Sequence, residues 1–325
     1  MEIRTMNTDQ RLLQAIAKLY YEEGRTQSEI ATQFSISRPK VSRKLAEARE
    51  RGIVKIFIDD AIDDISEMEQ QLLTAFHLKG ARVASVPEDD VELAIQLTAR
   101  LGAQFLKAFL NPGDHIGVNW GWTLFELSKE FPDFALPDCS LVQLSGAVDN
   151  ANCRSFAHEI ISNLSQKLGA ESAFCLPCPA LVESPIILDI LLHDAKVRSL
   201  LERVEACNKL FVNIATPDED SCLYQAGYLN DENIARLKDV GAVGSICSRF
   251  FDKNGNICDP ELDKRTVGVS LDAIKNAECV LACIVGRQKA RAVYYALKAG
   301  WIDVLVTDSL TAERVIDLAK REGVL

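Results

Sequence analysis

Two short segments combine glycine with groups suited to binding an anion, and each follows an apolar run typical of a strand. In 119–123, Asn-Trp-Gly-Trp-Thr, Gly121 permits close backbone approach and Thr123 places a hydroxyl beside exposed helix amides. In the second, Gly286 opens a predicted helix, and Lys289 can reach back to a dianion. The first segment is explained equally well by an ordinary strand-to-helix turn, and a lone G-x-x-K is a weak signal. Two such loops on one sheet strengthen each other and predict a phosphate site.

A third loop and several cysteines complete the residues that can do chemistry. Ser145 and Gly146 follow another apolar run, where a hydroxyl and the backbone can meet a polyol. Cys175 and Cys178 have the spacing of a redox pair, but no second C-x-x-C or spaced histidine pair accompanies them. We therefore expect the ten cysteines to be reduced thiols, mostly in the core. We expect no metal and no cofactor.

Residues 26–51 indicate a different activity, because they read as two helices joined by a tight turn. Thr26 followed by Glu29 has the pattern of a capping box at the start of the first helix. Ser37 is predicted to cap the second helix, and Pro39 lies in its first turn, where a missing amide costs little. This arrangement is typical of a helix-turn-helix.

The exposed face of that second helix is basic. It is predicted to consist of Arg38, Lys40, Ser42, Arg43 and Lys44. In a helix-turn-helix the N-terminal residues of the second helix reach base edges in the major groove. We expect Arg38 and Ser42 to contact base edges, and Lys40, Arg43 and Gln27 to contact mainly phosphates. The full predicted DNA-contacting set is Thr26, Gln27, Ser37, Arg38, Lys40, Ser42 and Arg43. The alternative is a solvated basic helix in an ordinary helical hairpin, and the caps, short turn and one-sided charge favour DNA over it.

The charge is divided between two parts of the chain. Residues 1–54 carry ten Lys or Arg and seven Asp or Glu, a net of +3, so the total of −11 leaves −14 on the remainder. A local basic field suffices for DNA binding, even on an acidic protein. A chain of 325 residues is expected to form two domains. With no apolar N-terminal leader and no run long enough for a membrane helix, we expect a cytoplasmic protein and no membrane partner.

From about Ile65 the pattern becomes strands alternating with amphipathic helices, which is typical of a parallel sheet covered on both faces. The predicted strands are 81–86, 115–119, 140–144, 172–176, 210–214, 280–285 and 304–306. The predicted helices are 8–23 and 27–34, then 65–78, 90–111, 122–130, 154–169 and 187–206. Such sheets bind ligands at the carboxyl ends of their strands.

The predicted fold class is therefore α/β, with two domains. Residues 1–56 form a helix-turn-helix, winged-helix-like domain in which 52–56 ends the last helix and begins a β-wing or linker strand. Residues 57–325 form a Rossmann-like parallel domain that binds an effector and mediates self-association. Asn254 and Gly255 are predicted at the tip of a hairpin turn.

The chain resembles the SorC-type sugar-binding transcriptional regulators. The matching stretches follow the family order and cover nearly the whole chain: LYYEEGRTQSEIA, ISRPKVSRKLAEARERGIVKI, IGVNWGWTL, VQLSGA, GAVGSICSRFFDKNGNI, RTVGVSLDAI and VTDSLTAERVI. The resemblance implies a helix-turn-helix and a domain similar to sugar-phosphate isomerases and deaminases. It also implies that a phosphorylated sugar changes operator affinity, and that the protein is a dimer or tetramer.

The resemblance assigns roles to individual positions. It implies that Gly121 and Thr123 hold the phosphate together with Gly286 and Lys289, and that Asp252 takes sugar hydroxyls. The implied effector-binding set is Gly121, Trp122, Thr123, Ser145, Gly146, Asp252, Gly286 and Lys289.

This chain departs from the family pattern at two of these loops. The deoxyribonucleoside branch carries lysine where this chain has Ser145, and serine cannot form an imine with a sugar. That difference argues against covalent capture of the effector. Val285 replaces the first of two family glycines, which narrows the predicted phosphate loop.

Two functions are compatible with this reading. The first is a transcription factor that binds double-stranded operator DNA under the control of a phosphosugar. The second is an isomerase-like or deaminase-like enzyme with a DNA-binding appendage. An enzyme of this kind needs a positioned general base, and the loops offer only Asp252 and Asp308 without a histidine or glutamate partner. We therefore expect a regulator and not an enzyme.

Overall fold

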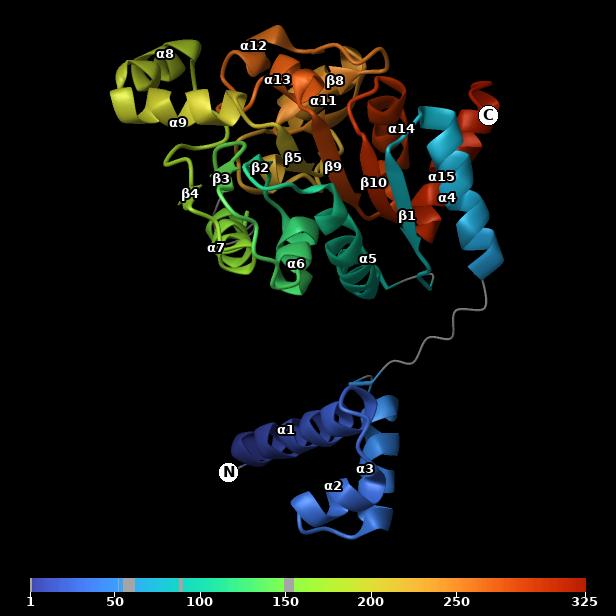
Figure 1. Ribbon diagram of the computed structural model, residues 1–325. Helices are drawn as coiled ribbons and strands as arrows, with labels where there is room; N and C mark the ends of the chain where they lie inside the picture. The colour runs from blue at the N-terminus through green and yellow to red at the C-terminus, as the bar shows by residue number, and fades with distance from the viewer. Residues whose placement is uncertain (1, 52, 55–61, 88–89, 149–154) are drawn as a thin grey trace. The chain divides into compact units, whose positions relative to one another are not determined.

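The computed structural model of the chain describes residues 2–51, 53–54, 62–87, 90–148 and 155–325 (Figure 1). The chain divides into two compact units, Met1–Asp60 and Ala61–Leu325, each with a hydrophobic core of its own. Most of the predicted wing or linker strand at 52–56 lies outside the described residues.

The N-terminal unit consists of three helices, α1 (Glu2–Tyr21), α2 (Gln27–Gln33) and α3 (Arg38–Glu50). The predicted capping box fixes the start of α2. The Glu29 amide donates to Thr26 Oγ1 at 3.3 Å, and the Thr26 amide donates to Glu29 Oε2 at 2.8 Å. Ser37 occupies the N-cap of α3 through its extended backbone alone, because its side chain makes no capping hydrogen bond.

One apolar face of each helix closes the core of this unit. Ile16 of α1 and Ile30 of α2 are fully buried, and they pack with Val41 and Leu45 of α3. Because Val41 and Leu45 lie four residues apart, they share one face of α3. The opposite face of α3 is left in solvent.

The C-terminal unit is built on a seven-stranded sheet with the order β1-β10-β9-β5-β2-β3-β4, in which every pairing is parallel. Its strands are β1 (Gly80–Ala84), β2 (His115–Val118), β3 (Ser140–Gln143), β4 (Ser172–Phe174), β5 (Lys209–Val212), β9 (Cys279–Ile284) and β10 (Val304–Asp308). All residues of β5, β9 and β10 are buried, as expected of strands covered on both faces.

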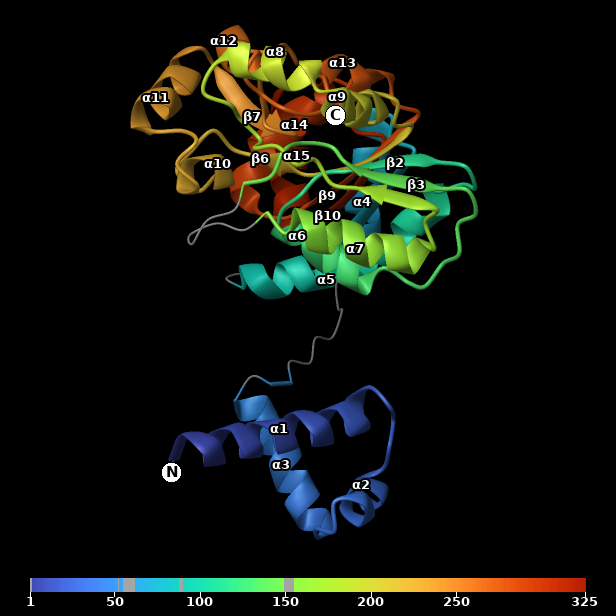
Figure 2. The same cartoon turned by 90° about the vertical axis from the view of Figure 1, so that its left-hand side faces the viewer.

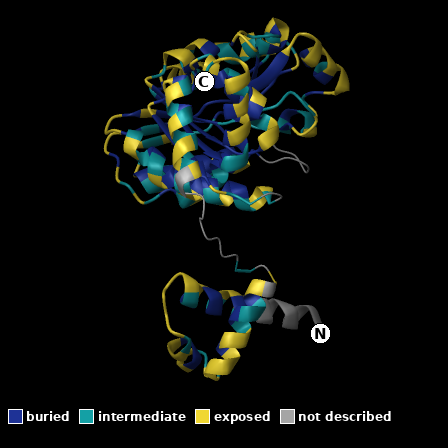
Figure 3. Ribbon diagram, turned by 90° about the vertical axis from the view of Figure 1, so that its right-hand side faces the viewer, coloured by how far each residue is buried: buried dark blue, intermediate teal, exposed yellow. Residues whose placement is uncertain are grey.

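Helices cover both faces of this sheet (Figures 1 and 2). One layer contains α5 (Val91–Leu106), α6 (Trp122–Glu130) and α7 (Ala157–Leu168). The other contains α4 (Ile62–Phe76), α9 (Ala195–Glu205), α13 (Leu271–Asn276), α14 (Ala290–Lys298) and α15 (Ser309–Arg321). Exposed residues lie along the outer sides of these helices, over a buried sheet (Figure 3). The predicted α/β class with helices on both faces is confirmed.

Shorter elements complete the unit. They are the 3₁₀ turns η1 (Lys107–Phe109) and η2 (Arg287–Lys289) and the helices α8 (Pro185–His193), α10 (Cys222–Gln225), α11 (Asp231–Asp239) and α12 (Pro260–Asp263). None of the helices in the described part of the chain is long and apolar enough to span a membrane.

The predicted single helix 187–206 is wrong, because the chain forms two helices there, α8 and α9. Asp194 ends the first, and its carboxylate accepts hydrogen bonds from the Lys196 and Val197 amides at 2.9 and 3.1 Å. An aspartate at this position caps a new helix better than it continues an old one.

A second sheet was not predicted. The strand expected at 210–214 ends at Val212, and the next residues turn into a three-stranded antiparallel sheet with the order β6-β7-β8. Its strands are β6 (Ile214–Ala215), β7 (Ala242–Ile246) and β8 (Arg249–Asp252). The predicted turn at 254–255 follows β8, where the Asp252 amide donates to the Asn256 carbonyl at 2.9 Å.

Among the cysteines that the structure describes, one departs from expectation. Cys222 is disulfide-bonded, so the prediction that all ten are reduced thiols is wrong there. Cys175 and Cys178 are free, and burial raises the pKa of both thiols. Burial also raises the pKa of Cys283, in the middle of the sheet, to about 12. These three thiols are therefore poor nucleophiles and metal ligands near neutral pH.

Candidate effector site and DNA-binding surface

The topological switch point of the large sheet lies between β2 and β5. From β2 the chain moves outward through β3 and β4, whereas from β5 it moves the opposite way through β9 and β10. The loops that follow β2 and β5 therefore diverge, and open α/β sheets bind ligands outside the carboxyl ends of strands at such a point. Asn119 follows β2 and Asn213 follows β5, so these two amides flank the switch point.

A chain of side-chain hydrogen bonds joins three loops there. Ser145 Oγ donates to Asn119 Oδ1 at 2.8 Å, and Asn119 Nδ2 donates to Asn213 Oδ1 at 2.8 Å. Asn213 Nδ2 donates in turn to the Trp120 carbonyl at 3.0 Å. Ser145 is fully buried and Asn119 nearly so. The bonds fix the orientation of polar groups that a small ligand at this edge would meet.

Gly121 is the N-cap of α6 and has a φ of 128°, a conformation that residues with a side chain rarely adopt. A Cβ atom there would lie 2.7 Å from Asn213 Nδ2. Its amide donates to the Ser155 carbonyl at 2.9 Å, so that amide is already used. The next amides of α6 lack intrahelical acceptors by helix geometry. Thr123 is buried in this first turn, and Trp122 remains 49% exposed.

Gly121→Ala tests whether a side chain at this position disturbs Asn213 and the chain of side-chain hydrogen bonds that it joins. We expect it to destabilise the fold by about 1–2 kcal/mol more than Gly113→Ala, as measured by chemical denaturation. Gly113 also has a positive φ, of 83°, but a Cβ there would meet nothing within 4 Å. The control therefore carries a backbone cost without the contact to Asn213. Equal losses for the two variants would show that Asn213 moves aside freely.

The loop after β9 is tied to the start of α15. The Gly286 amide donates to Asp308 Oδ2 at 3.0 Å and to Thr311 Oγ1 at 3.1 Å. Asp308 also caps α15, because its Oδ1 accepts the Thr311 amide at 2.9 Å. The Gly286 amide is thus occupied within the protein, and the glycine serves mainly by its φ of 123°.

Lys289 lies at the end of the same loop, on η2, and is half-buried. Burial of the amine lowers the pKa of Lys289, and the nearby Asp218 and Asp308 carboxylates oppose that effect. Within the described part of the chain, its amine makes no ion pair with either carboxylate at 4.0 Å or less. A lysine held in this way can bind an anion without first breaking a salt bridge.

Gly146 contributes through packing. A Cβ at this position would lie 2.1 Å from the Pro179 carbonyl oxygen, so only glycine permits the approach of the two backbones. Its amide donates to the Val267 carbonyl at 2.9 Å, and its carbonyl accepts the Trp120 indole N–H at 2.8 Å. Both backbone groups are satisfied inside the protein.

Asp252 does not join the other predicted effector residues. Its Oδ1 accepts the amides of Asn254 and Asn256 at 2.9 Å each. The glycine of the same turn packs against Ala299 and Trp301, which lie between the end of α14 and the start of β10. That position is the amino edge of the sheet, whereas the other loops lie at its carboxyl edge.

Sequence reasoning missed two residues of this site. They are Asn213 and Asp218, which follow β5 and β6. Asn213 follows an apolar strand just as Asn119 does, so its position was the available signal. Asp218 lies in an acidic turn. No local sequence pattern indicates that this turn lies near Lys289, some seventy residues away.

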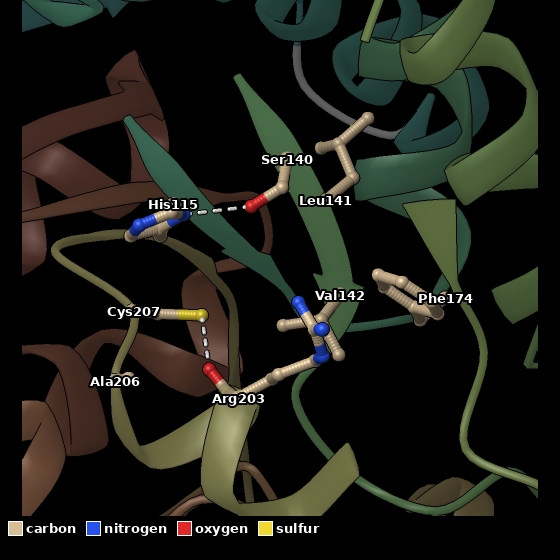
Figure 4. A pocket seen from close by; sticks show the side chains of 8 residues that line it. All are labelled: His115, Ser140, Leu141, Val142, Phe174, Arg203, Ala206 and Cys207. Carbon is tan, nitrogen blue, oxygen red and sulfur yellow. Dashed lines mark hydrogen bonds between the residues drawn. The ribbon is translucent and has the colours of Figure 1, made fainter. Parts of the chain in front are cut away.

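A separate pocket of about 180 Å³ lies at the opposite edge of the sheet (Figure 4). Its walls include His115 and Ser140, the first residues of β2 and β3, whose side chains are joined at 2.8 Å. The Arg203 guanidinium lies 4.8 Å from the centre of the Phe174 ring on another wall. None of the residues predicted to bind effector lines this pocket.

The N-terminal unit presents the predicted DNA-binding surface. Arg38, Lys40 and Arg43 are exposed on the first two turns of α3, and within the described residues no ion pair engages them. Lys44 differs, because it is half-buried and bonded to Glu47 at 3.0 Å. The remaining predicted contacts, Thr26, Ser37 and Ser42, are exposed, and Gln27 is half-buried. The unpaired cations are thus concentrated at the N-terminal end of α3.

Together the two units define a class of protein. One is a basic three-helix unit, and the other is a doubly wound domain whose polar loops meet at a switch point. A chain that combines these two units has the domain organisation of a ligand-controlled transcriptional regulator.

Comparison with known proteins gives the family. Residues 60–317 match the family described as "Putative sugar-binding domain". The chain is 30% identical over 301 residues to the deoxyribonucleoside regulator of Bacillus subtilis (strain 168), covering 93% of this chain and 96% of that protein. It is 30% identical over 312 residues to the sorbitol operon regulator of Klebsiella pneumoniae, covering 95% and 98%. The crystal structure of full-length SorC from Klebsiella pneumoniae matches with a TM-score of 0.73 at 29% identity, over 94% of this chain and 98% of that one.

The chain therefore belongs to this sugar-binding domain family, of SorC type, and is a bacterial transcriptional regulator. The predicted resemblance is confirmed. The relatives named here are regulators by name, which accords with a regulatory role for the chain.

Proposed function

We propose that the protein binds operator DNA through α3 and a phosphorylated sugar at the switch point of its large sheet. The observation that carries this proposal is the bonded chain Ser145–Asn119–Asn213 at the carboxyl ends of three strands, on the same edge as Lys289. Amide and hydroxyl groups suit sugar hydroxyls, and an unpaired ammonium suits a phosphate dianion.

The environment of Lys289 supports an anionic group of the ligand beside its amine. Burial of the Lys289 amine disfavours its charged form, and a phosphate bound beside it would favour that form. Asp218 and Asp308 lie near the same amine, and carboxylates can accept hydrogen bonds from sugar hydroxyls. Trp122, half-exposed beside the first turn of α6, is placed to cover an apolar sugar face.

The same geometry supports regulation over catalysis. Of the carboxylates near Lys289, Asp308 is committed to capping α15 and to the Gly286 amide, and Asp218 accepts the Asp220 amide at 3.1 Å. Asp252 is bonded within its own turn at the other edge of the sheet. An isomerase needs a base within hydrogen-bond reach of the substrate carbon. We therefore propose a regulator without enzymatic activity, acting as a self-associated protein in the bacterial cytoplasm.

The effector can change operator affinity only to the extent that it binds two conformations of the protein with different affinities. Regulation therefore requires that the site closes differently in the DNA-bound and released forms. The loops after β2, β5 and β9 come from both sides of the switch point, so one ligand that contacts all three couples them.

The proposal is tested by thermal denaturation of the full chain against phosphorylated sugars, their unphosphorylated counterparts and inorganic phosphate. A ligand at about 100 times its Kd should stabilise the fold by about 2.7 kcal/mol. The active compound is then added to a complex with operator duplex recovered by in vitro selection. We expect a phosphosugar to stabilise the protein and to change operator affinity, with no turnover of the sugar. Stabilisation by free sugars alone, or turnover of the active compound, would contradict the proposal.

A further inference from the structure

Helix α8 is mostly apolar although none of its nine described residues is buried. Apart from Asp189 and His193, its side chains are aliphatic or proline. Leu188 and Leu191 point inward, because they pack on a buried cluster that includes Val182. Asp189 and His193 are exposed on one flank of the helix. The rest of its outer surface is apolar, and apolar helix surface is normally covered.

Its outer side carries a stripe of three isoleucines, flanked by the exposed Asp189. Ile186 and Ile190 are 67% and 64% exposed, and Ile187 is 39% exposed. Because Ile186 and Ile190 lie four residues apart, they stand one above the other on the same face. Three exposed isoleucines on one short helix form a contiguous patch of the kind that marks a protein–protein contact.

The neighbouring ridge of α9 carries charges in a self-complementary order. Arg198 and Glu202 are exposed and one turn apart, and within the described residues neither takes part in an ion pair. Arg198 Nη1 lies 3.4 Å from the Leu192 carbonyl in the last turn of α8, so the ridge borders the isoleucine stripe. Figure 1 shows the two helices side by side at one end of the C-terminal unit.

A two-fold axis would pair the opposite charges of two copies of this ridge. In an isologous contact, residue i of one copy meets residue j of the other and the reverse. Two antiparallel copies of the ridge therefore place Arg198 opposite Glu202 of the second copy, twice. The same operation places Ile186 opposite Ile190 of the second copy and removes the stripe from water. A partner of different sequence would satisfy the stripe but would have no reason to match this charge order.

We propose that the outer face of α8, with the Arg198–Glu202 ridge of α9, is a two-fold contact between copies of this chain. The inference goes beyond the proposed function, because it depends on neither the effector nor the operator. It names the surface through which one association step of the protein takes place.

Sedimentation velocity of the full chain over a range of concentrations tests this contact. Ile186→Glu combined with Ile190→Glu places like charges across the axis, and we expect it to weaken one association step by roughly 100-fold or more. Val91→Glu is the matched control, because Val91 is 61% exposed on α5, at the start of a helix outside the proposed contact. The control should sediment like the parent. A parent chain that is monomeric throughout, or a double variant that associates like the parent, would overturn the proposal.

A charge exchange keeps the test valid if the isoleucine variant fails to fold. Arg198→Glu and Glu202→Arg should each weaken association, because each places like charges opposite one another across the axis. The combined exchange restores opposite charges at both positions and should return association toward that of the parent. Association that stays weak in the combined variant, with an unchanged circular dichroism spectrum, would overturn the proposed pairing.

Discussion

Replacing Arg38 by alanine is expected to weaken operator binding by about 1–3 kcal/mol and to relax the base preference at one position of each half-site. Arg38 begins α3, is exposed, and has no ion pair to break within the described residues. Its guanidinium is therefore free to form a bidentate contact with a guanine edge. Fluorescence anisotropy with the selected operator and with single-base variants of it measures both effects.

Two other arginines of α3 serve as references for this measurement. Arg49→Ala removes an exposed arginine about three turns farther along, beyond the part of a recognition helix that contacts bases, and should leave the base preference intact. Arg43→Ala should weaken binding to all DNA sequences alike. It should also lower the salt dependence of the binding constant by the equivalent of about one phosphate contact. If Arg38→Ala binds operator as tightly as the parent, the register assigned to α3 on DNA is wrong.

Lys289→Met is expected to abolish stabilisation by the phosphorylated effector and to leave operator binding intact. The lowered pKa means that the folded protein disfavours the Lys289 ammonium relative to the unfolded chain, whose lysines titrate near 10.5. The protonated amine thus costs stability at neutral pH, and this cost disappears as the pH rises from the folded pKa toward 10.5. The unliganded variant should accordingly be at least as stable as the parent. Thermal denaturation with and without effector measures both properties.

Lys298→Met is the matched control, because it removes a lysine from the end of α14 whose pKa is raised by its bond to Glu322. That exposed pair should contribute only about 0–1 kcal/mol, and its loss should not alter the effector response. A further check is pH. Effector affinity should fall as the pH rises through the pKa of Lys289, below 10.5. Full effector response in Lys289→Met would exclude this lysine from the site.

Local patterns were sufficient wherever a structural feature depends on residues close in the chain. The Thr26–Glu29 capping box forms from residues three apart, and the sequence predicted it with its partners. The glycines at Gly121 and Gly286 were likewise recognised, because a strand that ends in glycine before a helix has a backbone requirement visible in the sequence.

The sequence by itself determined the two-part plan of this protein, the basic face of α3 and the loops after β2, β3 and β9. Only the tertiary structure decided which loops meet, because strand order is set by pairings between residues far apart in the chain. The bond between Asn119 and Asn213 spans ninety-four residues and exists because β5 returns to lie beside β2. Long-range strand pairing also places Asp252 at the amino edge of the sheet. It places Asp218 close enough to the Lys289 amine to affect its pKa, although no local pattern links the two residues.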